Sequence, residues 1–339
     1  MDRFKNQILQ FCIGGETSIY ELIKRQDFSL KEFFENIKKL SDKGILKVEN
    51  GKVRLRDEIK KEYGFLEAID DPGCKNCEKT GYEIKGFFEK LKTKWLEVTK
   101  NRPEAIEVYD QGFIAPDGII RRVEFIYERG DLLGSEIFIM GDDDLLSLAL
   151  ALTGLPKRIQ VVEIDERLVS FINEVAKREN LPVQAEIFDA QYALPDKFRK
   201  RFDVFITDPV ETIAGFTLFI SRATAALKGI GSAGYLGLTT IEASRAKWYE
   251  IQRLFSEMGF VITDIRREFS LYPRGDKNFS RYEEKCQVYK VVGVGADCDW
   301  YVSSFFRLEA VTEPKAKVEG TQIIDEKVYK DDESWATPY

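Results

Sequence analysis

The 339-residue chain contains no histidine. Histidine is the commonest general base of enzymes and the commonest neutral metal ligand in proteins. Its absence excludes every mechanism that pairs a histidine with a serine or cysteine nucleophile. Any proton transfer must therefore use aspartate, glutamate, tyrosine, lysine, cysteine or water.

Cysteine is also scarce, and long apolar runs are missing. The five cysteines are an odd number spread thinly along the chain, which does not favour a disulfide framework. No apolar run approaches the length of a membrane span, and the N-terminus has no signal-peptide pattern. We therefore expect a cytoplasmic protein with no membrane partner.

The charge balance is acidic. The chain has 58 acidic and 51 basic residues and a net charge of -7. Net negative charge argues against a general polyanion binder, so we expect no nucleic-acid partner. The hydrophobic fraction of 44% is ordinary for a globular protein, and the length allows two or three domains.

Residues 1–60 have the pattern of a winged-helix-like domain. Short helical stretches, the first at Phe4–Phe11, are followed by a helix over Leu30–Leu40 that Ser29 can cap. A hairpin around the Asn-Gly turn at 50–51 comes next. This order is typical of a DNA-contacting module or of a packing and dimerisation module. The third helix mixes acids with its lysines, which favours packing.

Residues 61–135 connect this domain to the next. They contain Cys74 and Cys77 in a CxxC spacing, which can hold zinc or cycle between thiol and disulfide. A structural zinc site needs four ligands, and the sequence offers neither a second CxxC pair nor a histidine. A complete site would need a second chain or the scattered cysteines elsewhere. Ordinary thiols in a turn are therefore favoured over zinc, and we expect no metal requirement.

The connecting segment also contains an alternating stretch. Ala105–Ile114 alternates like a strand, with Tyr109, Asp110 and Gln111 at its centre. These three side chains can line the mouth of a cleft, or they can belong to a structural edge strand. A helical pattern follows this stretch.

Residues 136–312 alternate strands with helices. The predicted strands are Ile137–Met140, Ile159–Ile164, Val183–Phe188, Val204–Thr207, Tyr235–Thr239, Val261–Phe269 and Gln287–Val292. The alternation predicts an α/β domain with a mainly parallel sheet covered on both faces. No helical pattern separates the last two strands, which predicts an antiparallel pair at one edge. Seven strands with that ending are typical of the class I methyltransferase fold, a Rossmann-like architecture.

The most informative feature is the run Gly141-Asp142-Asp143-Asp144, directly after the apolar strand Ile137–Met140. In Rossmann-type folds this position carries a glycine-rich loop that lets an anion approach the positive end of a helix. Here carboxylates replace two of the expected glycines. Because three adjacent negative side chains repel an anion and attract a cation, we expect a nucleotide-type pocket rebuilt for a positively charged ligand.

Acidic residues also follow the next three predicted strands. In an open α/β sheet, ligands bind outside the carboxyl ends of the strands. One acid at a strand end is commonplace, because aspartate caps the helix that follows. Four such strand ends in a row are harder to explain by capping, so we predict one acidic cleft. Its further acids are Glu163, Asp165, Asp189, Asp208 and Glu211.

The positions of these acids separate their expected roles. Glu163 lies about 20 residues beyond the first turn, the spacing at which an acid binds the ribose hydroxyls of a nucleotide. Asp189 follows the third strand, where this fold binds an adenine amino group, and Asp208 follows the fourth strand at the reaction centre. The residues expected to bind a nucleotide-like donor are Gly141, Asp142, Glu163, Asp165, Asp189 and Ala190.

Four motifs resemble those of the branched-chain polyamine synthases. They are the acidic turn at 141–144, Val162-Glu163-Ile164-Asp165, Asp208-Pro209 and Tyr109-Asp110-Gln111-Gly112. These enzymes are aminopropyltransferases, also called N(4)-bis(aminopropyl)spermidine synthases. The resemblance covers nearly the whole chain, since that family places a winged-helix-like domain before a methyltransferase-like catalytic domain. It implies decarboxylated S-adenosylmethionine as donor, a linear polyamine such as spermidine as acceptor, and methylthioadenosine as by-product.

The residues support this chemistry independently. Ordinary S-adenosylmethionine brings a carboxylate close to the first turn, where the aspartates oppose it, and decarboxylation removes that charge. The attacking amine must lose a proton to a carboxylate, for which Asp144 is the first candidate and Asp208 the second. We further expect a homodimer. The expected substrate-binding residues are Asp142, Asp143, Asp144, Tyr109, Gln111, Asp208 and Glu211.

The final segment, residues 313–339, is charged and poorly periodic. We expect a mobile acidic tail. A solvated terminus is favoured, and the alternative is that its acids and Trp335 fold over a bound polyamine.

Two other functions stay open at this point. An acid-proline step after the fourth strand recurs among amine-methylating enzymes, so an S-adenosylmethionine-dependent amino-methyltransferase acting on nucleic acid or protein is the main alternative. The acidic rim and the missing basic patch argue against it. A transcription regulator that senses polyamines is the non-enzymatic alternative.

Overall fold

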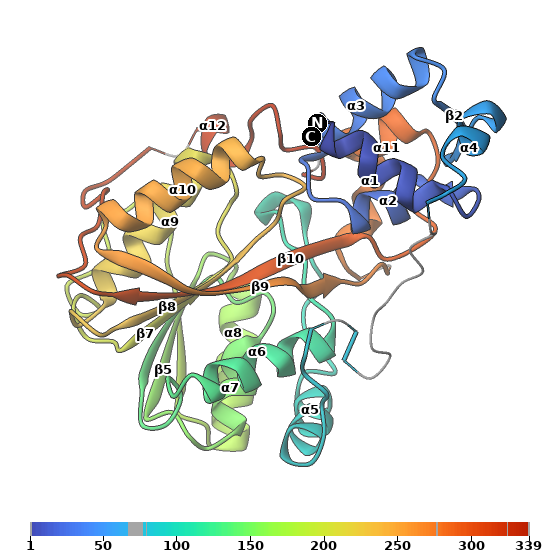
Figure 1. Cartoon of the computed structure of the whole chain (residues 1–339). Coiled ribbons are helices and arrows are strands. Elements are labelled where there is room, and N and C mark those ends of the chain that lie inside the picture. Colours follow the sequence, from blue (N-terminus) through green and yellow to red (C-terminus); the bar gives the residue numbers. More distant parts are fainter. Residues whose placement is uncertain (1, 67–76, 79, 276, 324, 338–339) are drawn as a thin grey trace.

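A seven-stranded sheet lies at the centre of the computed structural model (Figure 1), which describes residues 2–66, 77–78, 80–275, 277–323 and 325–337. The strand order is β6-β5-β4-β7-β8-β10-β9. All neighbouring pairs are parallel except those made by β10, which runs antiparallel to both β8 and β9. This order confirms the predicted methyltransferase-like sheet with an antiparallel edge. The strands are β4 Glu136–Met140, β5 Arg158–Glu163, β6 Val183–Ile187, β7 Val204–Thr207, β8 Ala233–Leu238, β9 Phe260–Tyr272 and β10 Tyr301–Ala310.

The last predicted strand is wrong. Gln287–Val292 forms the helix α11, and the strand that pairs with β9 is β10. The central residues of β10 are buried without alternation, because the sheet is covered on both faces there, so the sequence shows no period-two pattern. α11 has only six residues, too few for a helical period to stand out against its β-branched valines.

Ala105–Ile114 is not a strand either. It forms the short 3-10 helix η1 (Glu107–Tyr109) and a loop. The backbone N–H groups of Gly112 and Ile114 donate to aspartate side chains of the acidic turn, at 3.1 and 2.7 Å, rather than to a neighbouring strand. The alternative of an edge strand is therefore wrong, and the loop is tied to the turn instead.

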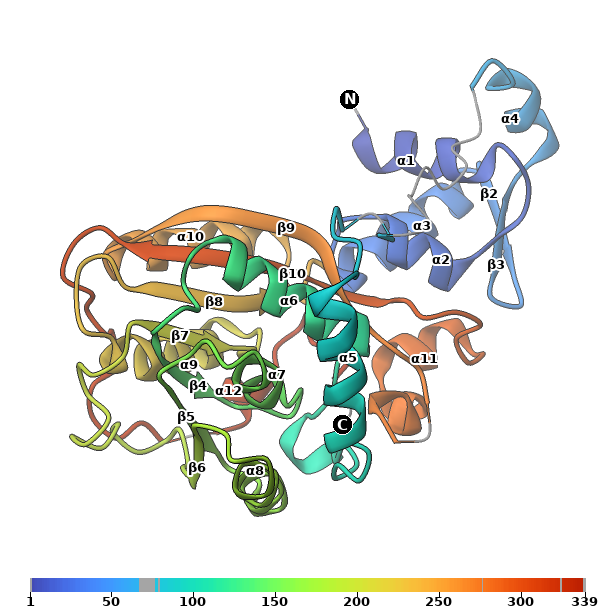
Figure 2. The ribbon, with the colours of Figure 1, turned by 90° about the horizontal axis from the view of Figure 1, so that it is seen from below.

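Helices cover both faces of the sheet (Figures 1 and 2). The face toward the viewer in Figure 2 carries α5 Phe87–Val98, α6 Pro116–Glu128, α7 Leu146–Leu152 and α8 Glu166–Glu179. The opposite face carries α9 Ile213–Ala226 and α10 Arg245–Glu257, and the short α12 (Glu326–Tyr329) packs on α9. In the described part of the chain, no helix has the length and apolar character needed to cross a bilayer.

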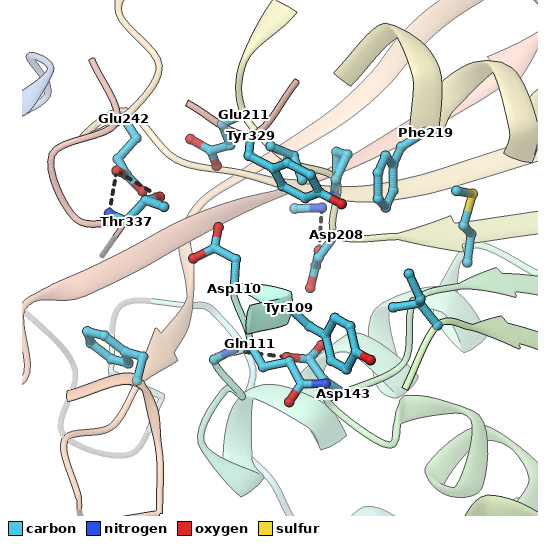
Figure 3. A pocket seen from close by; sticks show the side chains of 18 of the residues that line it. Tyr109, Asp110, Gln111, Asp143, Asp208, Glu211, Phe219, Glu242, Tyr329 and Thr337 are labelled. Atoms are coloured by element: carbon cyan, nitrogen blue, oxygen red, sulfur yellow. Dashed lines mark hydrogen bonds between the residues drawn. The ribbon is translucent and has the colours of Figure 1, made fainter. Parts of the chain in front are cut away.

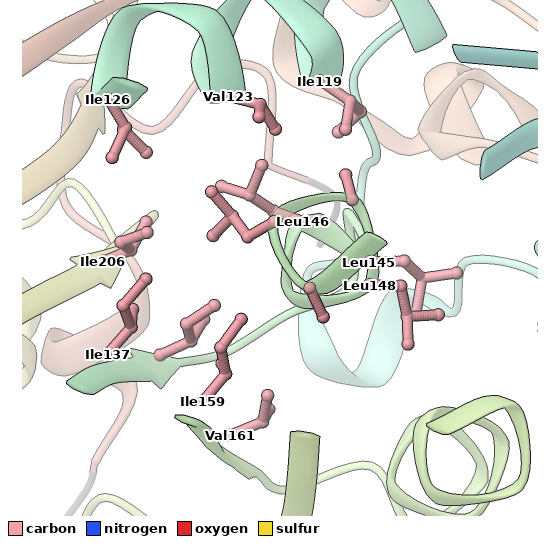
Figure 4. Packing of buried hydrophobic residues seen from close by; sticks show 14 of the residues in the cluster. Ile119, Val123, Ile126, Ile137, Leu145, Leu146, Leu148, Ile159, Val161 and Ile206 are labelled. Carbon is pink, nitrogen blue, oxygen red and sulfur yellow. The ribbon is translucent and has the colours of Figure 1, made fainter. Parts of the chain in front are cut away.

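Figure 4 shows the core between α6, α7 and the parallel strands. Side chains of α6, such as Val123 and Ile126, meet Leu146 of α7 and the strand residues Ile137 and Ile206, and all are buried. Burying an aliphatic side chain of this size contributes roughly 1.5–3 kcal/mol. The core thereby fixes the carboxyl ends of the strands, where the acidic residues lie.

The N-terminal unit, residues 2–62, packs against the sheet domain at one end (Figure 1). Its hairpin turns at Asn50 and Gly51, which have φ of 50° and 71° as a tight hairpin turn requires. The predicted order of helices followed by a hairpin is present, and the winged-helix assignment stays a prediction. Its elements are α1 Arg3–Cys12, β1 Thr17–Ser18, α2 Ile19–Arg25, α3 Leu30–Asp42, β2 Leu46–Glu49, β3 Lys52–Leu55 and α4 Asp57–Glu62.

The C-terminal segment 325–337 lies against the rest of the protein. Val328 and Ala336 are buried, and the Trp335 ring stacks on Phe34 of α3 with centroids 5.6 Å apart. These contacts place the segment along the cleft described below. The predicted mobility of this tail stays a prediction.

Candidate active site

A cleft opens at the carboxyl ends of the parallel strands (Figure 3). Seven carboxylates line it, and among the described residues that line it there is no lysine or arginine. The acids come from the η1 loop, from the ends of β4, β5, β7 and β8, and from the turn after β6. They are Asp110, Asp143, Glu163, Asp189, Asp208, Glu211 and Glu242.

The acidic turn divides its three aspartates between the cleft and the interior. Gly141 and Asp143 line the cleft, whereas Asp142 and Asp144 do not. Asp142 is buried and caps α7, since its carboxylate accepts from the N–H of Leu146 at 2.8 Å. Asp142 therefore holds the start of the helix, and only the middle aspartate faces the ligand space.

Asp144 lies behind the cleft wall. Its Oδ1 accepts from the N–H of Ile114 at 2.7 Å, and its Oδ2 lies 3.4 Å from the guanidinium of Arg122. Burial raises the pKa of Asp144 well above its ordinary value, and the Arg122 charge opposes this rise. In this arrangement Asp144 fixes the η1 loop and pairs with a buried cation.

Arg122, which the sequence analysis did not single out, connects two of the predicted acids. It projects from α6, is fully buried, and its Nη1 lies 2.6 Å from Asp208 Oδ2. Its Nε donates to the Ser270 hydroxyl at 3.0 Å, and its guanidinium lies 4.5 Å from the centre of the Phe305 ring. No sequence pattern marks Arg122, because its helix has an ordinary amphipathic pattern. Only the fold brings its side chain next to the two aspartates.

Asp208 stands at the centre of the cleft. Its Oδ1 accepts from the N–H of Gly237 on β8 at 2.7 Å. A Cβ atom at position 237 would lie only 2.2 Å from that oxygen, so only glycine allows the carboxylate this close to the strand. Two fixed donors, the Gly237 N–H and Arg122, thus set the direction of the Asp208 carboxylate.

The η1 loop supplies the wall opposite Asp208 (Figure 3). Tyr109, Asp110 and Gln111 all line the cleft, as the first of the two sequence alternatives states. The amide of Gln111 donates to Asp165 at 2.9 Å, and its carbonyl oxygen accepts from the N–H of Ile106. The loop is therefore fastened both to the acidic turn and to the end of β5.

Asp143 has the chemistry of a proton acceptor. Its carboxylate accepts one backbone hydrogen bond, from Gly112 at 3.1 Å, and forms no salt bridge with a described arginine or lysine side chain. The Arg102 guanidinium instead donates to the backbone carbonyl of Asp143, and its charge partly opposes the rise in the pKa of Asp143. Burial, and next the charge of Glu163, raises the pKa of Asp143 to about 7. A carboxylate with such a pKa exchanges protons near neutral pH.

One end of the cleft combines apolar surface with the acids predicted to bind the donor. Gly141, Glu163, Asp189 and Ala190 line this end together with Met140, Val162, Phe188 and Phe219. Glu163 accepts from the N–H groups of Asp142 and Asp165, each at 2.9 Å. Asp165 does not line the cleft. It caps α8 and pairs with Arg167. Burial alone would raise the pKa of Asp165, but the hydrogen bonds from Arg167 and Gln111 outweigh this effect and lower it.

The other end of the cleft is polar and contains Glu211 and Glu242 (Figure 3). Glu211 accepts from the N–H of Thr239 at 2.6 Å, and burial raises its pKa to about 7. Burial, and next the charge of Glu211, raises the pKa of Glu242 to about 8. Glu242 was not predicted from the sequence, although it follows β8 just as the predicted acids follow their strands.

A metal site has little support in the described residues. Between residues 2 and 337, the described side chains form no group of three or more acids or cysteines arranged to hold a metal ion. Cys77 is a free thiol, and Cys74 lies outside the described residues. The alternative of zinc at these two cysteines therefore stays a prediction.

The chain is similar to known proteins over most of its length. Residues 90–336 match the model of the branched-chain polyamine synthase A C-terminal domain. An N(4)-bis(aminopropyl)spermidine synthase of Methanocaldococcus jannaschii is 39% identical over 89% of this chain and 85% of its own. One of Thermococcus kodakarensis is 38% identical over 96% of this chain and 93% of its own.

A solved structure agrees with these relatives. It is the branched-chain polyamine synthase of Thermus thermophilus in complex with N4-aminopropylspermidine and 5'-methylthioadenosine. Its TM-score is 0.87 at 33% identity, with 99% of this chain and 93% of that chain covered. The chain belongs to the branched-chain polyamine synthase family.

Proposed function

We infer that this protein is an aminopropyltransferase. It moves the aminopropyl group of decarboxylated S-adenosylmethionine to the internal secondary amine of spermidine or a related linear polyamine, and releases methylthioadenosine. The observation that carries this proposal is the cleft with seven carboxylates and no basic side chain among its described lining residues. The relatives' names and the ligands of the Thermus thermophilus structure agree with it.

The charges of the cleft select both substrates. At an effective dielectric constant of about 20, two unit charges about 4 Å apart interact by about 4 kcal/mol. The carboxylate of intact S-adenosylmethionine would be repelled by Asp143 and Glu163, whereas the decarboxylated donor presents only cationic groups there. A polyamine adds further ammonium groups, which Asp110, Glu211 and Glu242 can bind. The amino-methyltransferase alternative fits the fold but not this electrostatic pattern.

The reaction is a displacement at the carbon beside the sulfonium. The lone pair of the acceptor amine forms the new C–N bond, the C–S bond breaks, and its electrons leave with the neutral thioether methylthioadenosine. The acceptor nitrogen loses one proton to a base. If the cleft binds both ends of a polyamine, its central nitrogen faces the donor, and this orientation increases the reaction rate.

Asp143 is the base in our proposal. It lies on the cleft, has one backbone hydrogen bond, and its pKa of about 7 suits proton transfer. Asp144, the first candidate from the sequence, lies behind the wall in a pair with Arg122. Asp208, the second candidate, is bound to Arg122 at 2.6 Å, and we assign it to orient the acceptor amine.

Two further expectations accompany the activity as proposals. One is assembly as a homodimer, which sedimentation of the purified protein measures. The other is a cytoplasmic location, which fractionation of the source cells measures.

The first prediction concerns the products. Incubation of the protein with decarboxylated S-adenosylmethionine and spermidine should give methylthioadenosine and a polyamine heavier by one or two aminopropyl groups. Tandem mass spectrometry should place the added group on the internal nitrogen. Intact S-adenosylmethionine serves as the control donor. Absence of methylthioadenosine would instead favour a polyamine-sensing regulator, and a methylated product would favour the methyltransferase.

The second prediction tests the base. Because the active form of Asp143 is deprotonated, kcat/KM should rise as the pH increases through about 7, the pKa of Asp143 in the free enzyme. Asp143→Asn should lower kcat by about 10²–10⁴-fold, the range for loss of a general base, and should remove this limb of the profile. Asp144→Asn and Asp208→Asn are the matched comparisons. If Asp144→Asn alone removes the limb, the sequence-based assignment is correct and ours is not.

The third prediction separates the two ends of the cleft. Glu163→Gln should raise the KM for the donor by about tenfold and leave the KM for the polyamine within about twofold, since one charged contact is worth roughly 1.5–3 kcal/mol. Glu242→Gln should do the reverse. Initial rates measured with each substrate varied in turn give both constants. Equal changes in both constants for both variants would contradict the division into donor and acceptor ends.

A further inference from the structure

Three chain segments that form the polar end of the cleft rest on the N-terminal unit. Ile241, Trp300 and Ala336 belong to the same buried cluster as the helices of that unit. Ile241 and Trp300 are each followed directly in the sequence by a cleft residue, namely Glu242 and Tyr301, and Ala336 itself lines the cleft. The residues that carry Glu242, Tyr301 and Ala336 at the polar end of the cleft are thus packed on the N-terminal core.

Glu242 joins these three segments to one another. Its carboxylate accepts from the Tyr301 hydroxyl at 3.0 Å, from the N–H of Ala336 at 2.7 Å and from the N–H of Thr337 at 3.1 Å. Figure 3 shows the bonds to the C-terminal segment at the left of the cleft. A shift of any one segment on the N-terminal core would therefore move the Glu242 carboxylate.

Helix α3 contacts two of these segments directly. The N–H of Leu30, in its first turn, donates to the carbonyl oxygen of Ile241 at 2.7 Å, one residue before Glu242. The ring of Phe34, one turn later, stacks on Trp335 with an interplanar angle of 16°. α3 therefore holds both the turn that carries Glu242 and the C-terminal segment that Glu242 binds.

The donor end of the cleft has no comparable support. Gly141 and Asp189 follow strands of the central sheet and Glu163 ends one, and no residue of β4, β5 or β6 is among the described members of the N-terminal cluster. Among the described residues, the N-terminal cluster therefore includes neighbours of the polar end of the cleft and no residue of the strands that carry the donor end.

We propose that the N-terminal unit is a positioning element of the polyamine site. Phe34 and the start of α3 hold Glu242 and the C-terminal segment where they receive an acceptor ammonium group. The unit sets the affinity for the polyamine and leaves that for the donor unchanged. In this role the buried face of α3 supports the polar end of the cleft. The proposal rests on the aminopropyl transfer proposed above.

The test is a comparison of single substitutions on α3. Phe34→Ala removes the stack on Trp335 and should raise the KM for spermidine by about tenfold, as expected when hydrogen bonds to a charged group are weakened. The KM for decarboxylated S-adenosylmethionine and kcat should stay within about twofold. Phe34→Tyr, which keeps the aromatic stack, should restore the KM for spermidine.

Lys38→Ala is the matched control, because Lys38 is an exposed position of the same helix. It should change neither constant. An unchanged KM for spermidine in Phe34→Ala, or an equal rise in both KM values, would overturn the positioning role. If Phe34→Ala does not fold, calorimetric binding of spermidine to Trp335→Phe and Trp335→Ala decides the question, with loss expected only for Trp335→Ala. Failure of the wild-type protein to transfer an aminopropyl group would overturn the proposed function itself.

Discussion

Mutual repulsion among seven carboxylates in one cleft is the constraint on which the rest of the site depends. Such a cleft is stable in the folded protein only if each acid has donors that compensate its burial. Backbone N–H groups supply most of them: Gly112 for Asp143, Gly237 for Asp208 and Thr239 for Glu211. These hydrogen bonds stabilise the carboxylates but do not neutralise them, so the cleft favours positively charged ligands such as a polyamine and a decarboxylated donor.

The same donors give the site its geometry. The sheet order brings the ends of the central strands together, and the core of α6 and α7 fixes them. The buried guanidinium of Arg122 then contacts both Asp144 and Asp208 through its Nη1 atom, which ties the acidic turn of β4 to the cleft residue Asp208 after β7. Loss of this cation would leave the buried Asp144 and the half-buried Asp208 without their charged partner. Breaking a buried pair in this way costs about 3–5 kcal/mol.

Much of this could be predicted from the sequence, because alternating strands and helices define the sheet and acids at strand ends meet at one edge. The direction of each acid could not be predicted. Asp142 and Asp144 belong to the same motif as Asp143, yet they turn inward because the N–H groups of Leu146 and Ile114 lie there. Glu242 could have been predicted, because it follows a strand like the other acids. Its hydrogen bonds to Tyr301 and to the C-terminal segment could not, because they join residues that are far apart in the sequence.

We infer from the charges of the cleft that it selects a donor without a carboxylate. Titration calorimetry with decarboxylated and with intact S-adenosylmethionine, in the presence of spermidine and under conditions that do not permit turnover, measures this selection directly. We predict that the decarboxylated donor binds at least about tenfold more tightly, a ratio equivalent to about 1.4 kcal/mol. Equal affinities, or tighter binding of the intact donor, would contradict it.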